Sequence, residues 1–203
     1  MTQKIFEAAE MIKSRRDVLK AGLVAGITGA AAIIGESLLL QPEVQAQGKG
    51  PAKGGPASSK ANDIVIMNVA LALEHQAIAA YSVGADTGLL SDKVKALAVH
   101  FQSQHMAHRD ALEKTIKSFN GTPVPAQAKY EFDTSKIKAE ADVLAFALNL
   151  EAGAASAYLG VLKSIFTKDL LPVVAGIACD ESQHAAVLRY ALGLQPAPDA
   201  VVK

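Results

Sequence analysis

The most restrictive feature of this sequence is a pattern of acidic, imidazole and tyrosine side chains that occurs twice. The segment LALEHQAIAAY, which contains Glu74, is matched 77 residues later by LNLEAGAASAY, which contains Glu151. The segments QHMAH and DESQH, which end in His108 and His184, lie 76 residues apart. Two helix-like segments that recur together at nearly one spacing indicate a duplicated helical hairpin. Each predicted helix would direct metal-ligand types of side chain toward one central point.

Apolar residues recur at three- and four-residue steps in four segments, which predicts four helices. We expect them at residues 63–86, 92–119, 138–166 and 170–193. Ser91 or Asp92 is the candidate N-cap of the second helix, and Asp169 that of the fourth, with Pro172 in its first turn. Few aromatic residues, no Trp and abundant Ala and Leu agree with an all-α bundle rather than a β-sandwich.

The segment between the second and third predicted helices is unusually long for a bundle. The sequence Asn120-Gly121-Thr122-Pro123 ends the second helix. About 18 residues then pass before the next helical pattern, enough to travel the full height of a bundle. The third helix is therefore expected to run parallel to the second. This predicts a four-helix bundle over residues 62–193, with two hairpins joined by one long crossover and a flexible tail at 194–203.

Charged and imidazole side chains fall within the apolar stripes that should face the core. An ionised carboxylate buried without a partner costs several kcal/mol. No Lys or Arg lies on these stripes, and a neutral imidazole does not neutralise a carboxylate. A divalent metal ion would satisfy all of these groups together. The candidate ligands are Glu74, His105, His108, Glu151, Glu181 and His184.

Other polar residues have more than one interpretation. Asp180 and Gln104 precede Glu181 and His105, and each either accepts a hydrogen bond from a ligating imidazole or is a solvated helix residue. Tyr81 and Tyr158 fit the core better than the site. His75, His100 and Cys179 are predicted to be non-ligands from their helical positions, with Cys179 a small core residue. The alternative for the whole site is a bundle whose buried acids are held by hydrogen bonds without metal.

The Glu181-Ser182-Gln183-His184 motif, together with Glu74 and Glu151, resembles the ferritin-like superfamily of diiron-carboxylate bundles. The crossover Gly121-Thr122-Pro123-Val124-Pro125, followed by Tyr130-Glu131-Phe132, is similar to that of exported bacterial ferritin-like domain proteins. The resemblance covers Ala61 to about Gly193. It implies one Glu from the first and third helices and one Glu-x-x-His from the second and fourth, and His108 matches this pattern as well.

His105 departs from the pattern that this resemblance implies. In the family its position holds a carboxylate that bridges two irons, and a neutral imidazole has one lone pair and cannot bridge. Either the site remains dinuclear with His105 as a terminal ligand, or it holds one Fe, Zn or Cu ion. We prefer a dinuclear site with two iron ions or a mixed pair, because all four helices still supply a ligand.

The N-terminal residues resemble an export signal. Ser14-Arg15-Arg16-Asp17 resembles the twin-arginine motif, an apolar segment follows at 21–34, and Val44-Gln45-Ala46 suits a signal peptidase. Residues 1–46 are therefore predicted to be a signal peptide read by the twin-arginine export machinery, and 47–61 a disordered Gly/Pro/Lys tether. The predicted location is the periplasm. The alternative is an uncleaved membrane anchor at 21–40.

Charge and cysteine content limit the classes of function. The net charge is zero and no basic stripe is present, which argues against nucleic acid as a partner. Cys179 is the single cysteine, so no internal disulfide or rubredoxin-type Cys pair is possible.

We expect an exported metal-binding protein with an iron-dependent redox site that reacts with O2 or peroxide, as a ferroxidase or peroxidase does. The alternatives are a non-catalytic metal-binding or stress-protective bundle and a metal-free interaction module. Enzymatic activity and a homodimer are both left open.

Overall fold

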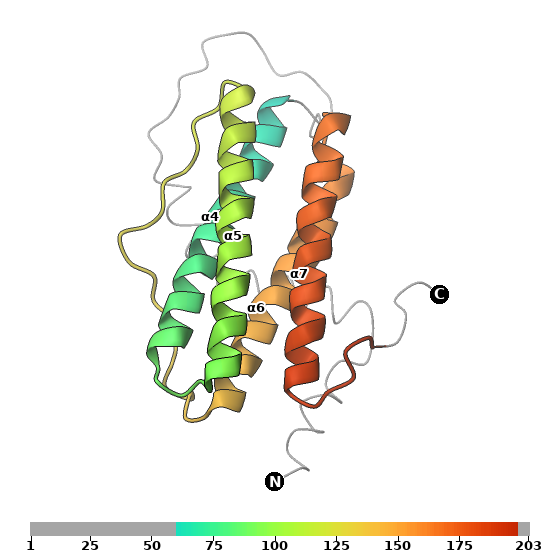
Figure 1. Cartoon of the computed structure of the whole chain (residues 1–203). Helices are drawn as coiled ribbons and strands as arrows, with labels where there is room; N and C mark the ends of the chain where they lie inside the picture. Colours follow the sequence, from blue (N-terminus) through green and yellow to red (C-terminus); the bar gives the residue numbers. More distant parts are fainter. Residues whose placement is uncertain (1–59, 199–203) are drawn as a thin grey trace. The chain divides into compact units, whose positions relative to one another are not determined.

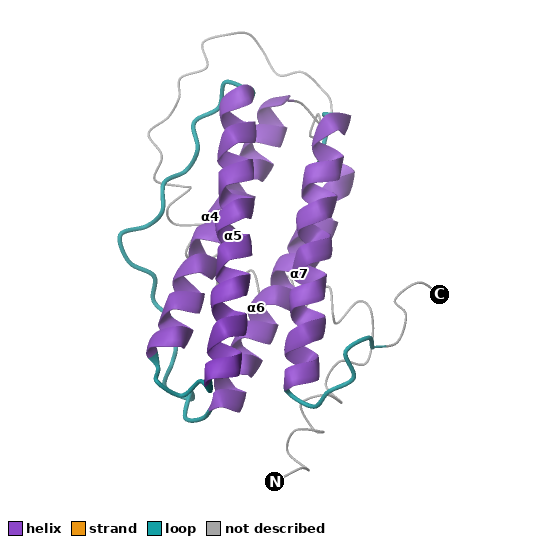
Figure 2. Cartoon of the chain, in the orientation of Figure 1, coloured by secondary structure: helices purple, strands orange, loops and turns teal. Residues whose placement is uncertain are grey.

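The computed structural model describes residues 60–198, which form four long helices and no strand (Figure 1, Figure 2). The helices are α4 (Lys60–Asp86), α5 (Asp92–Ser118), α6 (Glu140–Val161) and α7 (Leu171–Ala191), with short 3-10 turns η2 (Leu162–Ser164) and η3 (Lys168–Leu170) before α7. The predicted all-α bundle is therefore confirmed. The predicted signal peptide, residues 47–59 of the predicted tether and the last five residues of the tail lie outside the described residues.

The four helices pair as two hairpins joined by the long crossover. α4 packs mainly on α5, and α6 mainly on α7. The crossover runs along the outside of the bundle from the end of α5 to the start of α6, so that α5 and α6 are parallel, as expected (Figure 1). Asn68 of α4 holds the start of the crossover, because its amide donates to the Thr122 carbonyl (3.1 Å) and accepts from the Val124 N–H (2.7 Å).

Helix α5 ends in a Schellman motif at the residues that the sequence suggested. Asn120 has a φ of 59°, and its N–H donates to the Lys117 carbonyl at 3.0 Å. The Gly121 N–H donates to the Ile116 carbonyl at 2.9 Å, which completes the motif. A Cβ on Gly121 would lie 2.8 Å from the Ile64 side chain. This close approach brings the crossover against α4.

The boundary between the third and fourth helices differs from the prediction. α6 ends at Val161, several residues before the predicted end at Phe166. Buried Asp63 accepts the backbone N–H groups of Phe166 (2.8 Å) and Thr167 (2.9 Å), so this segment bonds to α4 and does not continue the helix. Asp169 lies inside η3, and Leu170 instead holds the N-cap position of α7.

Two apolar clusters form the core along the bundle. The larger contains Met67, Leu71, Leu112, Ile116, Tyr158, Leu170, Val174 and Ile177. The smaller contains Tyr81, Phe101, Leu144 and Leu188. On every helix the predicted ligand residues fall, in sequence, between members of the two clusters. The bundle therefore has a polar layer near mid-height that is covered by apolar side chains on both sides.

Candidate metal centre

All six residues predicted as ligands converge in this polar layer and are buried. Glu74 comes from α4 and Glu151 from α6, while α5 and α7 each contribute two residues one helical turn apart. Glu74, His105 and Glu151 are each 1% exposed, and Glu181 is fully buried. Carboxylates buried to this degree require compensating positive charge or hydrogen bonds.

The six residues form two overlapping groups of four. The first group is Glu74, His105, His108 and Glu181, and the second is His105, Glu151, Glu181 and His184. Within each group the donor atoms, one from each residue, lie within 4.8 Å of one another. His105 and Glu181 belong to both groups. The arrangement therefore consists of two half-sites that share one imidazole and one carboxylate.

The His105 ring lies between the two half-sites. Its Nδ1 is 2.8 Å from Glu74 Oε2 and 3.5 Å from Glu181 Oε1. Its Nε2 is 3.2 Å from Glu151 Oε1. One imidazole thus presents a different nitrogen to each half-site and contacts all three carboxylates of the centre.

The other two imidazoles are held from outside the centre by residues of the opposite hairpin. His108 Nε2 is 3.1 Å from Asp180 Oδ2, and His184 Nε2 is 3.0 Å from Gln104 Oε1. Of the two interpretations of Asp180 and Gln104, the structure shows contact with the imidazoles. Because each Nε2–H donates outward, the Nδ1 lone pair of the neutral ring faces the carboxylates.

Two tyrosine hydroxyls also reach the carboxylates, which the sequence interpretation did not assign to the site. Tyr81 of α4 donates to Glu151 of α6, and Tyr158 of α6 donates to Glu74 of α4. The available signal was the spacing: in both copies the tyrosine follows the glutamate by seven residues, which is two turns along one helix face. Burial and the adjacent carboxylates raise the pKa of both phenols, so they remain protonated donors.

Protonated imidazoles and carboxylates stabilise one another in this layer. Burial opposes the charged form of His105, but Glu151, Glu74 and Glu181 outweigh it and raise its pKa to about 10. The pKa of His108 is likewise about 10, because Glu181, Glu74 and Asp180 outweigh burial.

The three carboxyl groups of the centre titrate differently. Burial opposes ionisation of Glu74 and Glu151, but the neighbouring imidazoles hold both pKa values below the usual range. For Glu181, burial and the adjacent Glu151 raise the pKa. Of the three, Glu181 is thus the carboxyl group whose negative charge is stabilised least by its neighbours.

Buried atoms without hydrogen-bond partners show that the donor set fits a metal ion. Among the described residues, four buried side-chain atoms make no hydrogen bond, and three of them are in this centre: both carboxylate oxygens of Glu181 and Nδ1 of His108, which lies 3.1 Å from Glu181 Oε1. Buried polar atoms are nearly always paired. Oxygen and imidazole nitrogen donors gathered at one point are those that Fe, Zn and Cu ions bind.

The residues predicted to be non-ligands lie outside the centre. His75 Nε2 is 3.3 Å from the Val124 carbonyl oxygen, where it supports the crossover. His100 is exposed on α5. Cys179 is exposed as well, so its prediction as a core residue was wrong. The inward positions of this turn are taken by Ile177, Ala178 and Glu181.

Comparisons with known proteins identify the family and the fold of this chain. Residues 62–194 match the family described as the ferritin-like domain. The crystal structure of a conserved hypothetical protein from Mycobacterium tuberculosis has 23% sequence identity and a TM-score of 0.60, and the match covers 70% of this chain and 99% of that one. None of the curated proteins matches this chain. The structural likeness, at this identity, concerns the fold.

Proposed function

The chain belongs to the ferritin-like domain family, and from this membership we propose that its buried centre binds iron and reacts with O2 or peroxide. The observation that carries the proposal is the pair of half-sites that share His105 and Glu181. Bound Fe²⁺ would supply the electrons for reduction of the oxidant. We propose two ions, one in each half-site.

The protein's own residues would orient the donors before metal binds. Asp180 and Gln104 fix the ring positions of His108 and His184, so that the lone pairs of the neutral rings point inward. Tyr81 and Tyr158 each hold one carboxylate oxygen of the opposite hairpin. Burial of the layer excludes bulk water, which strengthens these electrostatic interactions.

A second candidate is a metal-binding or stress-protective bundle without turnover. The observation that favours it is His105, because its ring contacts all three carboxylates and, when protonated, balances part of their charge without metal. A metal-free interaction module differs from this candidate in that its centre binds no ion at all. Iron loading and reaction with O2 distinguish the three.

We propose further that the protein is exported by the twin-arginine route. Support comes from Ser14-Arg15-Arg16 and the apolar segment that follows it in the sequence. Export of an already folded chain would allow metal to be inserted before translocation. Cell fractionation tests this: recovery of the mature protein in the cytoplasm alone would contradict it.

The deciding experiment is anaerobic titration with Fe²⁺ followed by exposure to air, with elemental analysis of the protein as isolated. The proposal predicts about two equivalents of iron per chain and a near-ultraviolet oxo-ferric band. Iron binding without O2 uptake would support the non-catalytic candidate. Less than about half an equivalent of any transition metal would support the metal-free one.

Glu151→Ala tests the site itself. It should lower both the iron content and the melting temperature of the loaded protein, because metal binding adds to folding stability. Glu113→Ala removes a partly exposed carboxylate of α5 and serves as the control. In a metal-free bundle Glu151→Ala should also lower the melting temperature, because it removes the carboxylate that His105 and His184 contact, but added iron should change the melting temperature of neither protein.

A further inference from the structure

The loop after α6 presents an aromatic side chain to solvent between two lysines. Its neighbour Ile165 packs against the larger apolar cluster, whereas Phe166 is 53% exposed. Lys163 and Lys168, on either side in the sequence, are exposed as well. A single exposed apolar residue needs no explanation by itself. What distinguishes this loop, residues 163–168, is its support and its charge.

The first turn of α4 holds the Phe166 loop in shape. Asp63 is fully buried and accepts the N–H groups of Phe166 (2.8 Å) and Thr167 (2.9 Å). The side-chain amide of Asn62 donates to the Ser164 carbonyl at 3.3 Å. A buried carboxylate thus fixes the backbone of Phe166 while the ring of Phe166 stays in solvent. A segment that is already ordered loses less conformational entropy when it binds a partner.

The chain reaches this end of the bundle through a basic segment. Residues 47–60, which lead into α4, contain three lysines and no acidic residue. The loop adds two lysines, with Asp169 as the one acid directly beside it in the sequence. The predicted tether and the loop therefore bring positive charge to the same end of the bundle as the exposed ring.

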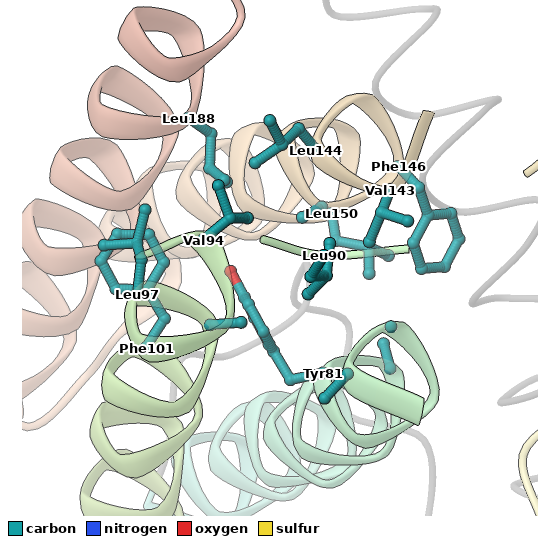
Figure 3. Close-up of a pocket in the computed structure, with 15 residues that line it drawn as sticks. Tyr81, Leu90, Val94, Leu97, Phe101, Val143, Leu144, Phe146, Leu150 and Leu188 are labelled. Atoms are coloured by element: carbon teal, nitrogen blue, oxygen red, sulfur yellow. The ribbon is translucent and has the colours of Figure 1, made fainter. Parts of the chain in front are cut away.

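Two apolar hollows of the bundle are too small to compete as sites for an apolar partner. One lies beside Tyr81 among the four helices (Figure 3), and the other lies beside Tyr158 between α4 and α6. Each has a cavity volume of about 30 Å³, which is room for about one water molecule. An apolar partner would therefore meet exposed side chains of this chain, such as Phe166.

An anionic lipid surface fits the exposed ring, the lysines and the position of the tether together. Aromatic rings are favoured at the boundary between lipid head groups and hydrocarbon, and lysines are attracted to anionic head groups. In the sequence the tether follows the apolar segment 21–34, which belongs at a membrane both as an export signal and as an uncleaved anchor. A second copy of the same loop would instead bring like charges together.

We propose that the Phe166 loop docks on an anionic phospholipid surface, with the Phe166 ring among the head groups and Lys163 and Lys168 against lipid phosphates. The opposite end of the bundle would then face away from the lipid. The contact requires no metal, so the proposal stands independently of the proposed redox function.

The sequence contains no Trp, so Phe166→Trp supplies a single fluorescent reporter in the loop. With vesicles of phosphatidylcholine and phosphatidylglycerol, its emission should move to shorter wavelength and be quenched by lipids brominated on their acyl chains. Phosphatidylcholine vesicles should give a weaker response, and added salt should reverse the response to anionic vesicles. Tyr190→Trp is the matched control, because Tyr190 is 74% exposed near the far end of α7. The reporter at position 190 should not respond.

Lysine variants of the Phe166→Trp chain measure the electrostatic part of the contact. Lys163→Gln and Lys168→Gln together should weaken vesicle binding about twentyfold, since each lysine near an anionic surface contributes about fivefold in affinity. The control replaces Lys93 and Lys95, two exposed lysines at the opposite end of the bundle, by Gln and should leave the affinity unchanged.

Absence of both the shift and the quenching at position 166, an equal response at position 190, or unchanged affinity of the loop-lysine variant would overturn the proposal. A shift that appears without vesicles as the protein concentration rises would show that a second copy covers the loop, and would also overturn it. A response to duplex DNA but not to vesicles would identify nucleic acid as the partner instead.

Discussion

At the scale of single residues, His105 most affects what this centre does. The sequence identified it as a departure at a position where a bridging carboxylate is expected. It did not reveal that the ring presents Nδ1 to one half-site and Nε2 to the other. The ring orientation depends on Glu74 and Glu151, which lie on other helices, so spacing along α5 alone does not determine it.

Replacement of His105 by glutamate tests this role. His105→Glu should destabilise the metal-free protein, because a fourth acid replaces the cation that the other three contact. The second equivalent of Fe²⁺ should bind more tightly, because a carboxylate offers a donor oxygen to each ion. Thermal melts in chelator and anaerobic iron titrations measure the two effects.

His100→Glu is the matched control on the exposed face of α5 and should change neither quantity. A His105→Glu protein with a higher melting temperature in chelator and unchanged iron stoichiometry would contradict the assigned position of this ring between the half-sites.

At the scale of helices, the sequence predicted where α5 stops but not where α6 stops. Asn120 and Gly121 are a local signal. A residue in the left-handed conformation ends a helix by its own backbone geometry, and the glycine after it lets the backbone pass close to its neighbours. The end of α6 depends on Asp63, about one hundred residues away in the sequence, which accepts the N–H groups of Phe166 and Thr167. Apolar periodicity continues past that point and contains no such information.

Gly121→Ala should destabilise the protein by about 1–3 kcal/mol, the usual cost of forcing extra volume into a packed site. The added Cβ would lie 2.8 Å from Ile64 and 2.9 Å from Ile116 in their side chains. Chemical denaturation gives the free energy of unfolding. Gly176→Ala, in α7, meets nothing within 4 Å and should be neutral or stabilising by up to about 1 kcal/mol. Equal effects at the two glycines would refute the close approach.

At the scale of the whole molecule, the fold and the convergence of six side chains followed from the repeat, because each helix carries its ligand types on the face that its apolar residues define. The crossing contacts of Tyr81 and Tyr158 did not follow from it, since tyrosine at helical spacing is ordinarily core.

Stability and metal affinity should respond to pH in opposite directions. In the folded chain the pKa of His105 and of His108 is about 10, above the value of about 6.5 for an unfolded histidine. The stabilisation from their protonation is therefore complete below about pH 6.5 and is lost as the pH rises toward 10. Metal binds the unprotonated nitrogens, so metal affinity should rise over the same range.

Thermal melts of chelator-treated protein between pH 6 and 10, with metal titrations at each pH, measure both trends. His105→Gln should lose part of the pH dependence of the melting temperature. A melting temperature of the metal-free protein that increases with pH over this range would contradict the charge arrangement of the centre.

The contacts that support the donors from residues outside the ligand set all cross between the two hairpins. Tyr81 holds Glu151 and Tyr158 holds Glu74, while Asp180 supports His108 and Gln104 supports His184. One hairpin alone therefore makes neither a complete half-site nor its supports. An ancestral chain with a single hairpin would have needed a second copy of itself, related by two-fold symmetry, to assemble such a centre. Gene duplication and fusion would then have joined two partners that already depended on each other, and only afterwards could the two copies diverge at His105.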